Sequence, residues 1–259
     1  MERHTILIIC TLAAALFTGC SVKEDRAGCP CRLDIDVSLC SRRGETVSLR
    51  GWNSSRPLFG GTLQVADWPD MWETTVPKGI VHYTAYTGTS SCMPSGSTLV
   101  IPEGNQCDSL WAYCTSVICE GEDASDRVYL HKQFCTVTME FTRDIGGSPG
   151  AVVTGHSAGM SLEGLSPVEG TFRYSPADDG QGHFIFRLPR QADSVLDVEI
   201  TRDGKHYETF PLGTIISRTG YDWTAQDLDD IYVGVDLIES TVTIRLEKWE
   251  EGTVYELEI

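Results

Sequence analysis

Residues 155–159, Gly-His-Ser-Ala-Gly, have the spacing of a hydrolase nucleophile. In the G-x-S-x-G pattern, a sharp turn from a strand into a helix exposes a reactive serine, here Ser157. The candidate base and orienting residues are His183, His206, Asp178, Asp193 and Asp197. However, Gly164 and Pro167 would interrupt the helix that must follow, and no His-Gly-Gly oxyanion segment precedes the motif. We therefore interpret the motif as a glycine-rich strand or turn and expect no enzymatic activity.

A second pair of residues could suggest a cysteine protease. His131 and Cys135 are four residues apart, so in a strand both would lie on one face. A cysteine nucleophile also needs a group that orients its histidine, and the sequence shows no evident candidate. A disulfide or a buried thiol is the better interpretation of Cys135.

Cys20 has the sequence context of a lipid acceptor. A short polar start is followed by an apolar run of about a dozen residues, where a membrane-spanning helix needs about 20. Such a run is typical of a signal peptide. It ends in Leu-Phe-Thr-Gly-Cys, which is similar to a lipobox, although Phe17 replaces the usual small or polar residue. We predict a signal peptide over 1–19 and lipidation of Cys20; an ordinary secretory signal with an incidental cysteine is the alternative.

The residues after Cys20 bear on where the protein would be exposed. Lys23, Glu24 and Asp25 are similar to the lysine-then-acidic surface-export tags of some Gram-negative bacteria. The alternative is a solvated linker. We assign residues 20–31 to a lipidated tether and expect the chain at the cell outer membrane, exposed on the surface.

Eight further cysteines lie beyond the tether's first residues, and none follows residue 135: Cys29, Cys31, Cys40, Cys92, Cys107, Cys114, Cys119 and Cys135. An even number in an exported chain suggests disulfides, but sequence alone does not give their pairing. Cys29 and Cys31 are too close along the chain to pair with each other in the usual geometry. The spacings lack two Cys-x-x-Cys knuckles, so we predict no metal site, and we find no signal for a cofactor.

Composition limits the possible partners. The chain has 259 residues and a formal net charge of −17. Binding to nucleic acid needs a basic surface, so this charge argues against it. A hydrophobic content of 41% is sufficient for buried cores, and the length allows one large or two ordinary domains.

The elements that would position these residues are strands throughout. Short strand-like runs recur between turns: 32–39, 46–49, 79–86, 109–118, 127–130, 134–141, 152–155, 170–174, 183–188, 195–202 and 206–211. A convincing helical pattern is found over 224–230. The run 144–150, rich in glycine, is the best candidate for a domain boundary. We predict all-β sandwich domains over 32–144 and 145–259.

Two further expectations concern surfaces. The run 241–249 and the run 253–259 form a plausible hairpin, and the last strand could be exchanged between subunits. Six tryptophans could line a glycan site, although most are expected in the core: Trp52, Trp68, Trp72, Trp111, Trp223 and Trp249.

Several short motifs, in order along the chain, resemble the fimbrillin-associated anchor family, the FimB/Mfa-type lipoproteins of type V pili. They are 29–33 (CPCRL), 76–79 (VPKG), 108–112 (DSLWA), 128–134 (VYLHKQF), 188–191 (LPRQ), 220–223 (GYDW) and 227–231 (DLDDI). No single motif is highly specific, and the extra cysteines depart from the family.

The resemblance implies a fold and a role. It implies two transthyretin-like β-sandwich domains in tandem and a fimbrial anchor that limits fibre length. The implied partners are stalk subunits, joined by strand addition, and the outer membrane. A surface adhesin, a glycan-binding module and a fimbrial tip subunit remain as alternatives.

Overall fold

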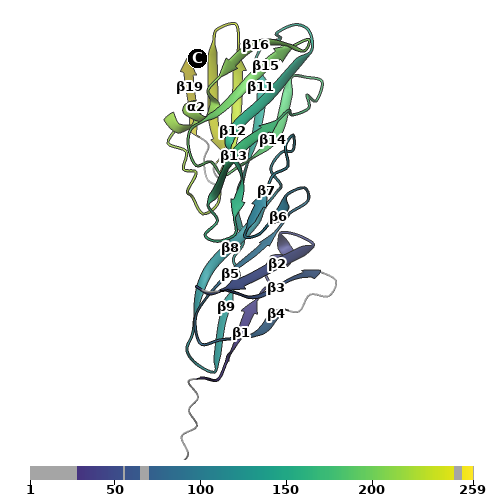
Figure 1. Cartoon of the computed structure of the whole chain (residues 1–259). Helices are drawn as coiled ribbons and strands as arrows, with labels where there is room; N and C mark the ends of the chain where they lie inside the picture. The colour runs from purple at the N-terminus through teal and green to yellow at the C-terminus, as the bar shows by residue number, and fades with distance from the viewer. Residues whose placement is uncertain (1–27, 55, 65–69, 248–252, 259) are drawn as a thin grey trace, which may run out of the picture.

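The computed structural model describes residues 28–54, 56–64, 70–247 and 253–258, the last six through their backbone only. The described chain is elongated, with β1 at one end and β19 near the other (Figure 1). Within it, four β-sheets are arranged as two pairs, and each pair encloses its own apolar core. The chain is therefore an all-β protein, as its alternating pattern predicts.

The first pair lies toward the N-terminal end. Sheet I has the order β4-β1-β9, and its strands are Met71–Val76, Cys31–Asp36 and Asp123–Arg127. Sheet II has the order β10-β8-β5-β2-β3, and its strands are His131–Lys132, Trp111–Cys119, Gly79–Thr87, Thr46–Trp52 and Pro57–Gln64. A 3-10 turn, η2 (Cys40–Arg42), precedes β2.

The core between sheets I and II follows directly from strand alternation. On β1, Leu33 and Ile35 are fully buried while Arg32 is exposed, because successive side chains of a strand point to opposite faces. Leu49 of β2 and Tyr83 of β5 complete the core from the facing sheet.

The second pair lies toward the C-terminal end. Sheet III has the order β16-β15-β12-β7-β6, with β13 also paired to β12; its strands are Lys205–Phe210, Leu196–Arg202, Pro149–Ser161, Thr98–Val100, Met93–Ser95 and Pro167–Tyr174. Sheet IV has the order β14-β11-β17-β18-β19; its strands are His183–Pro189, Phe134–Phe141, Asp230–Asp236, Thr241–Glu247 and Thr253–Glu258.

A third, smaller core joins the two pairs. It contains Tyr86 of β5, Leu99 of β7 and Met160 of β12, together with Leu110 and Leu162. The hairpin β6–β7 lies early in the chain, yet β7 pairs with β12 over Val100–Gly159 to Thr98–Ser161. This core therefore connects the two halves by packing as well as by chain connection.

Most predicted strands are found. The predicted run 134–141 matches β11. Predicted runs also overlap β1, β2, β5, β8, β12 to β16, β18 and β19. The run 127–130 is wrong as a strand, because β9 precedes it and ends at Arg127. Val128 is buried and its backbone N–H donates to the Asp36 carbonyl at 3.0 Å, so it extends the pairing of β9 with β1 by one hydrogen bond.

The predicted helix over 224–230 is wrong. This segment forms turns, in which the Asp222 carboxylate accepts hydrogen bonds from the backbone and side chain of Thr224. The α-helix of the described chain is α2 (Leu212–Arg218), whose sequence contains glycine and β-branched residues that disfavour helices. Its buried face, with Leu212, Ile215 and Ile216, belongs to the second core, so tertiary packing overrides local propensity.

The predicted boundary between residues 144 and 145 does not coincide with a change of sheet. β11 precedes it, yet pairs antiparallel with β14 and parallel with β17, both from beyond it. The change from sheet II to sheet IV falls between β10 and β11, at Gln133. The division into 32–144 and 145–259 stays a prediction.

Candidate functional site

Cys20, the predicted lipidation site, and the tag Lys23, Glu24 and Asp25 lie outside the described residues. The described chain begins just before β1 at the narrow end of the molecule (Figure 1). Across the segments that the structure describes, no helix is long and apolar enough to cross a membrane. The lipid site therefore stays a prediction, and the remaining candidates are surfaces of the two sheet pairs.

Two of the quoted motifs, 128–134 and 188–191, meet where the sheet pairs join. Phe134 pairs with Pro189, and the Arg190 guanidinium donates to Gln133 Oε1 at 2.9 Å. Arg190 also donates to the carbonyls of Trp223 and Ala225, the latter at 2.8 Å. We call Gln133, Arg190 and these two carbonyls the junction lock.

The junction lock is buried and contains a charge. Gln133 is 3% exposed and Arg190 is 9% exposed. Burial lowers the pKa of the Arg190 guanidinium, and its Nε atom has no hydrogen-bond partner among the described residues. A buried cation that loses its hydrogen-bond acceptors destabilises the fold. Arg190 therefore requires Gln133 and the two carbonyls to stay in place, which fixes the chain where the two halves meet.

A third motif, 227–231, fastens the same region from its outer side. Asp227 accepts from the Lys132 backbone N–H at 2.6 Å and pairs with His131 Nδ1 at 2.9 Å. Asp230 accepts from the Thr136 backbone N–H at 2.6 Å and pairs with the Lys132 ammonium group. These carboxylates hold β10 and the start of β11 in place.

A cleft of about 960 Å³ lies beside these pairs and is lined by η2, β10, the start of β11 and residues 227–230. The Arg43 guanidinium lies 3.9 Å from the centre of the Trp111 ring at this cleft. Asp227 and Asp230 are already occupied by protein donors, so the arrangement is that of a junction between sheets and not of free acid–base groups.

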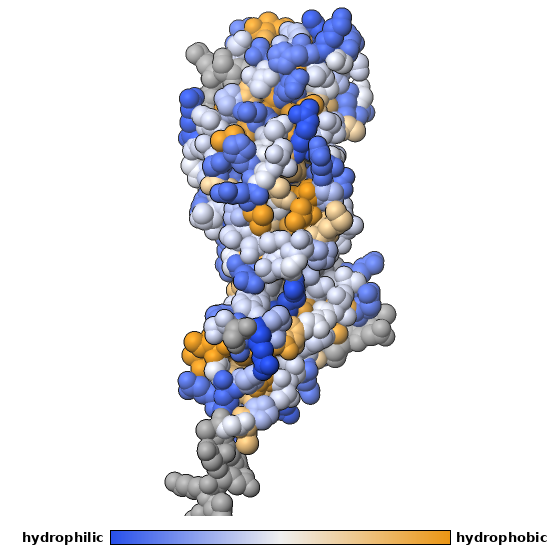
Figure 2. All heavy atoms as spheres, viewed as in Figure 1, coloured by the Kyte–Doolittle hydropathy of each residue, from blue (hydrophilic) through white to orange (hydrophobic). Residues whose placement is uncertain are grey.

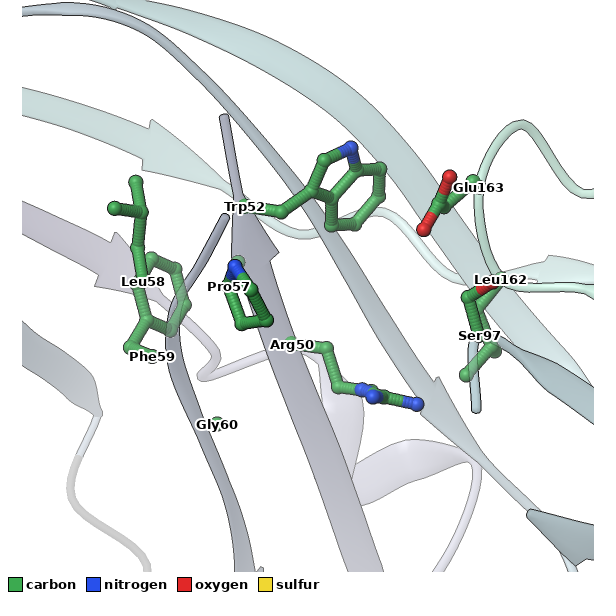
Figure 3. Close-up of a pocket in the computed structure, with 10 residues that line it drawn as sticks. Arg50, Trp52, Pro57, Leu58, Phe59, Gly60, Ser97, Leu162 and Glu163 are labelled. Carbon is green, nitrogen blue, oxygen red and sulfur yellow. The ribbon is translucent and has the colours of Figure 1, made fainter. Parts of the chain in front are cut away.

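A smaller hollow, of about 340 Å³, lies beside β3 and is shown in Figure 3. β3 is an edge strand of sheet II, and its Leu58 and Phe59 line the hollow with Trp52. The Trp52 ring stacks on His82, with ring centres 5.9 Å apart. Glu163 stands across from Trp52 in Figure 3. An aromatic ring beside charged groups at an unpaired strand edge could receive either a sugar or a peptide strand.

The other tryptophans do not form one site. Trp72 and Trp223 have buried indole N–H groups that find no partner in the described part of the chain, and Trp111 lies at the larger cleft. Trp68 and Trp249 lie outside the described residues.

Ser157 lies within β12 and has no geometry for catalysis. It is 1% exposed, and its hydroxyl accepts the Ala192 backbone N–H at 3.2 Å. His156 is instead exposed and pairs with Asp193 at 3.2 Å. Gly159 is explained by packing, since an added Cβ would lie 2.1 Å from the Leu99 carbonyl oxygen of β7.

The proposed histidine partners of Ser157 lie elsewhere. His183 pairs with Asp179 at 3.1 Å, and His206 hydrogen-bonds Thr209 at 3.1 Å. Neither has a hydrogen bond to Ser157 in the part of the chain that the structure describes. The strand–turn–helix of a hydrolase elbow is absent at this position, because β12 continues through the motif.

Cys135 and His131 also lack the environment of a nucleophile and its base. Burial raises the pKa of the Cys135 thiol to about 12, the opposite of what a nucleophile needs, while His131 is taken by Asp227. No disulfide joins the eight described cysteines in this structure, and their pairing stays a prediction. Among described residues, no group of three or more histidines, cysteines or carboxylates could hold a metal ion.

The motif at 108–112 contains a buried carboxylate whose role the sequence does not reveal. Asp108 is 2% exposed and accepts hydrogen bonds from the N–H and hydroxyl groups of Ser90 and Ser91 and from the Cys92 N–H at 2.7 Å. Burial alone would raise the pKa of Asp108, but these hydrogen bonds outweigh it and hold that pKa well below its usual range. Asp108 thus fixes the loop before β6.

Comparison with known proteins shows which solved structures share this fold. No family model matches the sequence, and no curated protein matches it. Among solved structures, the fimbrial anchor protein Mfa2 from Porphyromonas gingivalis superposes with a TM-score of 0.62 at 11% identity, over 85% of this chain and 98% of that one. The two chains share one fold. The predicted resemblance is thereby confirmed at the level of the fold.

Two further structures match equally well. A proposed polysaccharide-binding protein from Bacteroides thetaiotaomicron has a TM-score of 0.64 at 14% identity, over 88% of this chain and 98% of its own. A candidate adhesin from Bacteroides ovatus has a TM-score of 0.63 at 12% identity, over 92% and 98%. The fold is thus shared by structures described as anchors, adhesins and glycan binders.

Proposed function

We propose that this chain is a non-enzymatic outer-membrane lipoprotein that anchors a fimbria to the cell surface and limits the length of the fibre. The observation that supports this most is the fold shared with a fimbrial anchor across 98% of that anchor's length, in a chain whose N-terminus carries a lipobox-like sequence. The sandwiches are proposed to be tandem transthyretin-like domains, divided as 32–144 and 145–259.

The proposal assigns the two ends of the molecule different tasks. Lipid on Cys20 would hold the end at which β1 begins, and two or more acyl chains give durable attachment. Lys23, Glu24 and Asp25 would direct that end to the outer face of the outer membrane. The stalk subunit would bind by strand addition, and the backbone pairing of β19 with β18 leaves β19 at the edge of sheet IV.

Replacement of Cys20 tests the anchor role. Cells producing Cys20→Ser should lose labelling of the protein by an alkyne fatty acid and should release intact fibres into the medium. The matched control is Cys29→Ser, since Cys29 is an exposed cysteine just before β1 and should leave both labelling and attachment unchanged. Attached fibres of normal length after deletion of the whole chain would reject the anchor role.

A glycan-binding adhesin is the second candidate function, favoured by the hollow beside Trp52 (Figure 3). Sugar rings stack on exposed aromatic faces, so Trp52→Ala should abolish glycan-array binding by the purified protein while leaving fibre attachment intact. Glycan binding that depends on Trp52, in a chain whose deletion leaves fibres attached, would favour the adhesin over the anchor.

A further inference from the structure

Two cysteines of the first sheet pair come together at one end of its core. Cys31, the first residue of β1, pairs with Val76, the last residue of β4. Cys119, the last residue of β8, pairs with Gly79, the first residue of β5. Val76 and Gly79 are separated only by Pro77 and Lys78, so one short connection brings both cysteines to the same end of sheets I and II.

The two thiols also face the same interior. Cys31 and Cys119 are both 0% exposed and belong to the same apolar core. The Cys31 thiol is within hydrogen-bonding reach of the Cys119 thiol; after burial, this neighbour is the next cause that raises the pKa of Cys119. The sulfur atoms are therefore neighbours across the two facing sheets.

The remaining thiols have other surroundings. Cys29 is exposed and Cys114 is half-buried. Cys40 belongs to the first core, and burial and then Asp36 raise the pKa of its thiol. Cys107 and Cys135 belong to the second core and Cys92 packs against it; after burial, Cys92 is the next cause that raises the pKa of the Cys107 thiol. Cys31 and Cys119 differ from these three in that their two thiols are within hydrogen-bonding reach of each other at the ends of facing strands.

We propose that Cys31 and Cys119 form a disulfide in the exported protein, which joins sheet I to sheet II. The Cys31 thiolate attacks one sulfur of a protein disulfide donor, a thiol oxidase of the exported compartment, and one donor thiol leaves. Cys119 then attacks the Cys31 sulfur of this mixed disulfide, and the second donor thiol leaves. Two protein thiols are oxidised and the donor disulfide is reduced to two thiols.

The position of this bond has a mechanical consequence, which rests on the proposed anchor function. If Cys20 holds the lipid, a pull on the fibre is transmitted through the folded chain and leaves it for the membrane at β1. Hydrogen bonds hold β1 between β4 and β9 in a sheet of three strands. A covalent bond from Cys31 to β8 would pass the force directly into sheet II, whose strands β8, β5 and β2 form its centre.

Peptide mapping of the full exported protein tests the bond. Protein taken from the membrane fraction is denatured in iodoacetamide, which alkylates free thiols, and is digested with chymotrypsin without reduction. We expect one linked species that joins the Cys31 and Cys119 peptides, in which Cys29 and Cys114 both carry the alkyl group. Alkylation of Cys31 and Cys119 in this protein, or their linkage to other cysteines, would overturn the proposal.

Matched variants confirm the assignment. Cys29→Ser and Cys114→Ser should keep the linked species, because each removes a neighbouring thiol and leaves the proposed pair. Cys119→Ser should make Cys31 accessible to alkylation after denaturation. If that variant fails to fold, the map of the unchanged protein still decides, and a phosphine reductant should lower its unfolding midpoint.

The proposed disulfide and the proposed anchor role can be rejected independently of each other. A linked peptide in a chain whose deletion leaves fibres attached would reject the anchor role and keep the disulfide. Alkylated Cys31 and Cys119 in a chain that needs Cys20 to retain fibres would reject the disulfide and keep the anchor role.

Discussion

Asp108 shows how one charged residue can organise a loop at the residue scale. Its carboxylate receives hydrogen bonds from three consecutive residues, Ser90, Ser91 and Cys92, and it is almost fully buried. A buried carboxylate is tolerated when its oxygens are satisfied by donors. The residue type was visible in the sequence, but its donors are 16 to 18 positions away along the chain.

Replacement of Asp108 should therefore destabilise the fold. Asp108→Asn removes charge-assisted hydrogen bonds and should lower the free energy of unfolding by about 3 kcal/mol at neutral pH. Urea unfolding followed by tryptophan fluorescence measures this loss. The control is Asp70→Asn, at an exposed position, which should change stability little.

The same residue predicts a pH dependence. Its folded pKa lies below the unfolded value of about 3.9, so its stabilisation is complete above that value. It is lost as pH falls through the unfolded value toward the folded one. The stability difference between the unchanged protein and Asp108→Asn should shrink in this range, and a constant difference down to acid pH would contradict the assignment.

At the scale of elements, the hairpin β6–β7 illustrates what close backbone approach requires. β7 pairs with β12 opposite Gly159, where an added Cβ would lie 2.1 Å from a backbone oxygen that cannot move aside easily. The glycine that completes a G-x-S-x-G pattern is therefore needed for strand pairing. The local pattern alone did not distinguish this use from a nucleophile elbow.

Gly159→Ala should loosen this pairing. Overpacking of this kind costs about 1–3 kcal/mol, and backbone amides of β6 and β7 should exchange hydrogen faster. Gly60→Ala on β3 is the control, since its Cβ would meet the nearest atom at an ordinary 3.5 Å. Equal exchange in β6 and β7 for both variants would show that the close contact is not needed.

At the scale of the whole molecule, the junction lock determines whether the two sheet pairs behave as one body. The third core spans the junction, and the lock holds Gln133, where the chain passes from sheet II to sheet IV, against Arg190 of the second sheet pair. Most of the face seen in Figure 2 is polar, with apolar residues in separate patches, in keeping with the formal net charge of −17.

Replacement of Arg190 should weaken the connection between the halves. Arg190→Ala leaves Gln133 Oε1 and the carbonyls of Trp223 and Ala225 without this donor, so the free energy of unfolding should fall by about 3 kcal/mol. Calorimetry should also show the unfolding transition broaden or divide into two. Arg173→Ala, at an exposed position of β13, should leave one unchanged transition.

The sequence alone determined the all-β class and most strands, because alternation of apolar and polar side chains is a local property with a period of two residues. It also contained the lipobox-like segment, since a signal is read from the linear chain. Seven strands were missed because their alternation is weak, short or hidden in a longer run: β3, β4, β6, β7, β9, β10 and β17.

Only the tertiary structure decided how these strands combine. The parallel pairings of β1 with β9 and β11 with β17 join segments far apart in the chain, and no local pattern encodes them. The same holds for Gln133 with Arg190 and for Cys31 with Cys119. Eight cysteines allow 105 pairings in sequence. The pair proposed here is selected by two sheets that face each other over one core, because burial and proximity are properties of the folded chain.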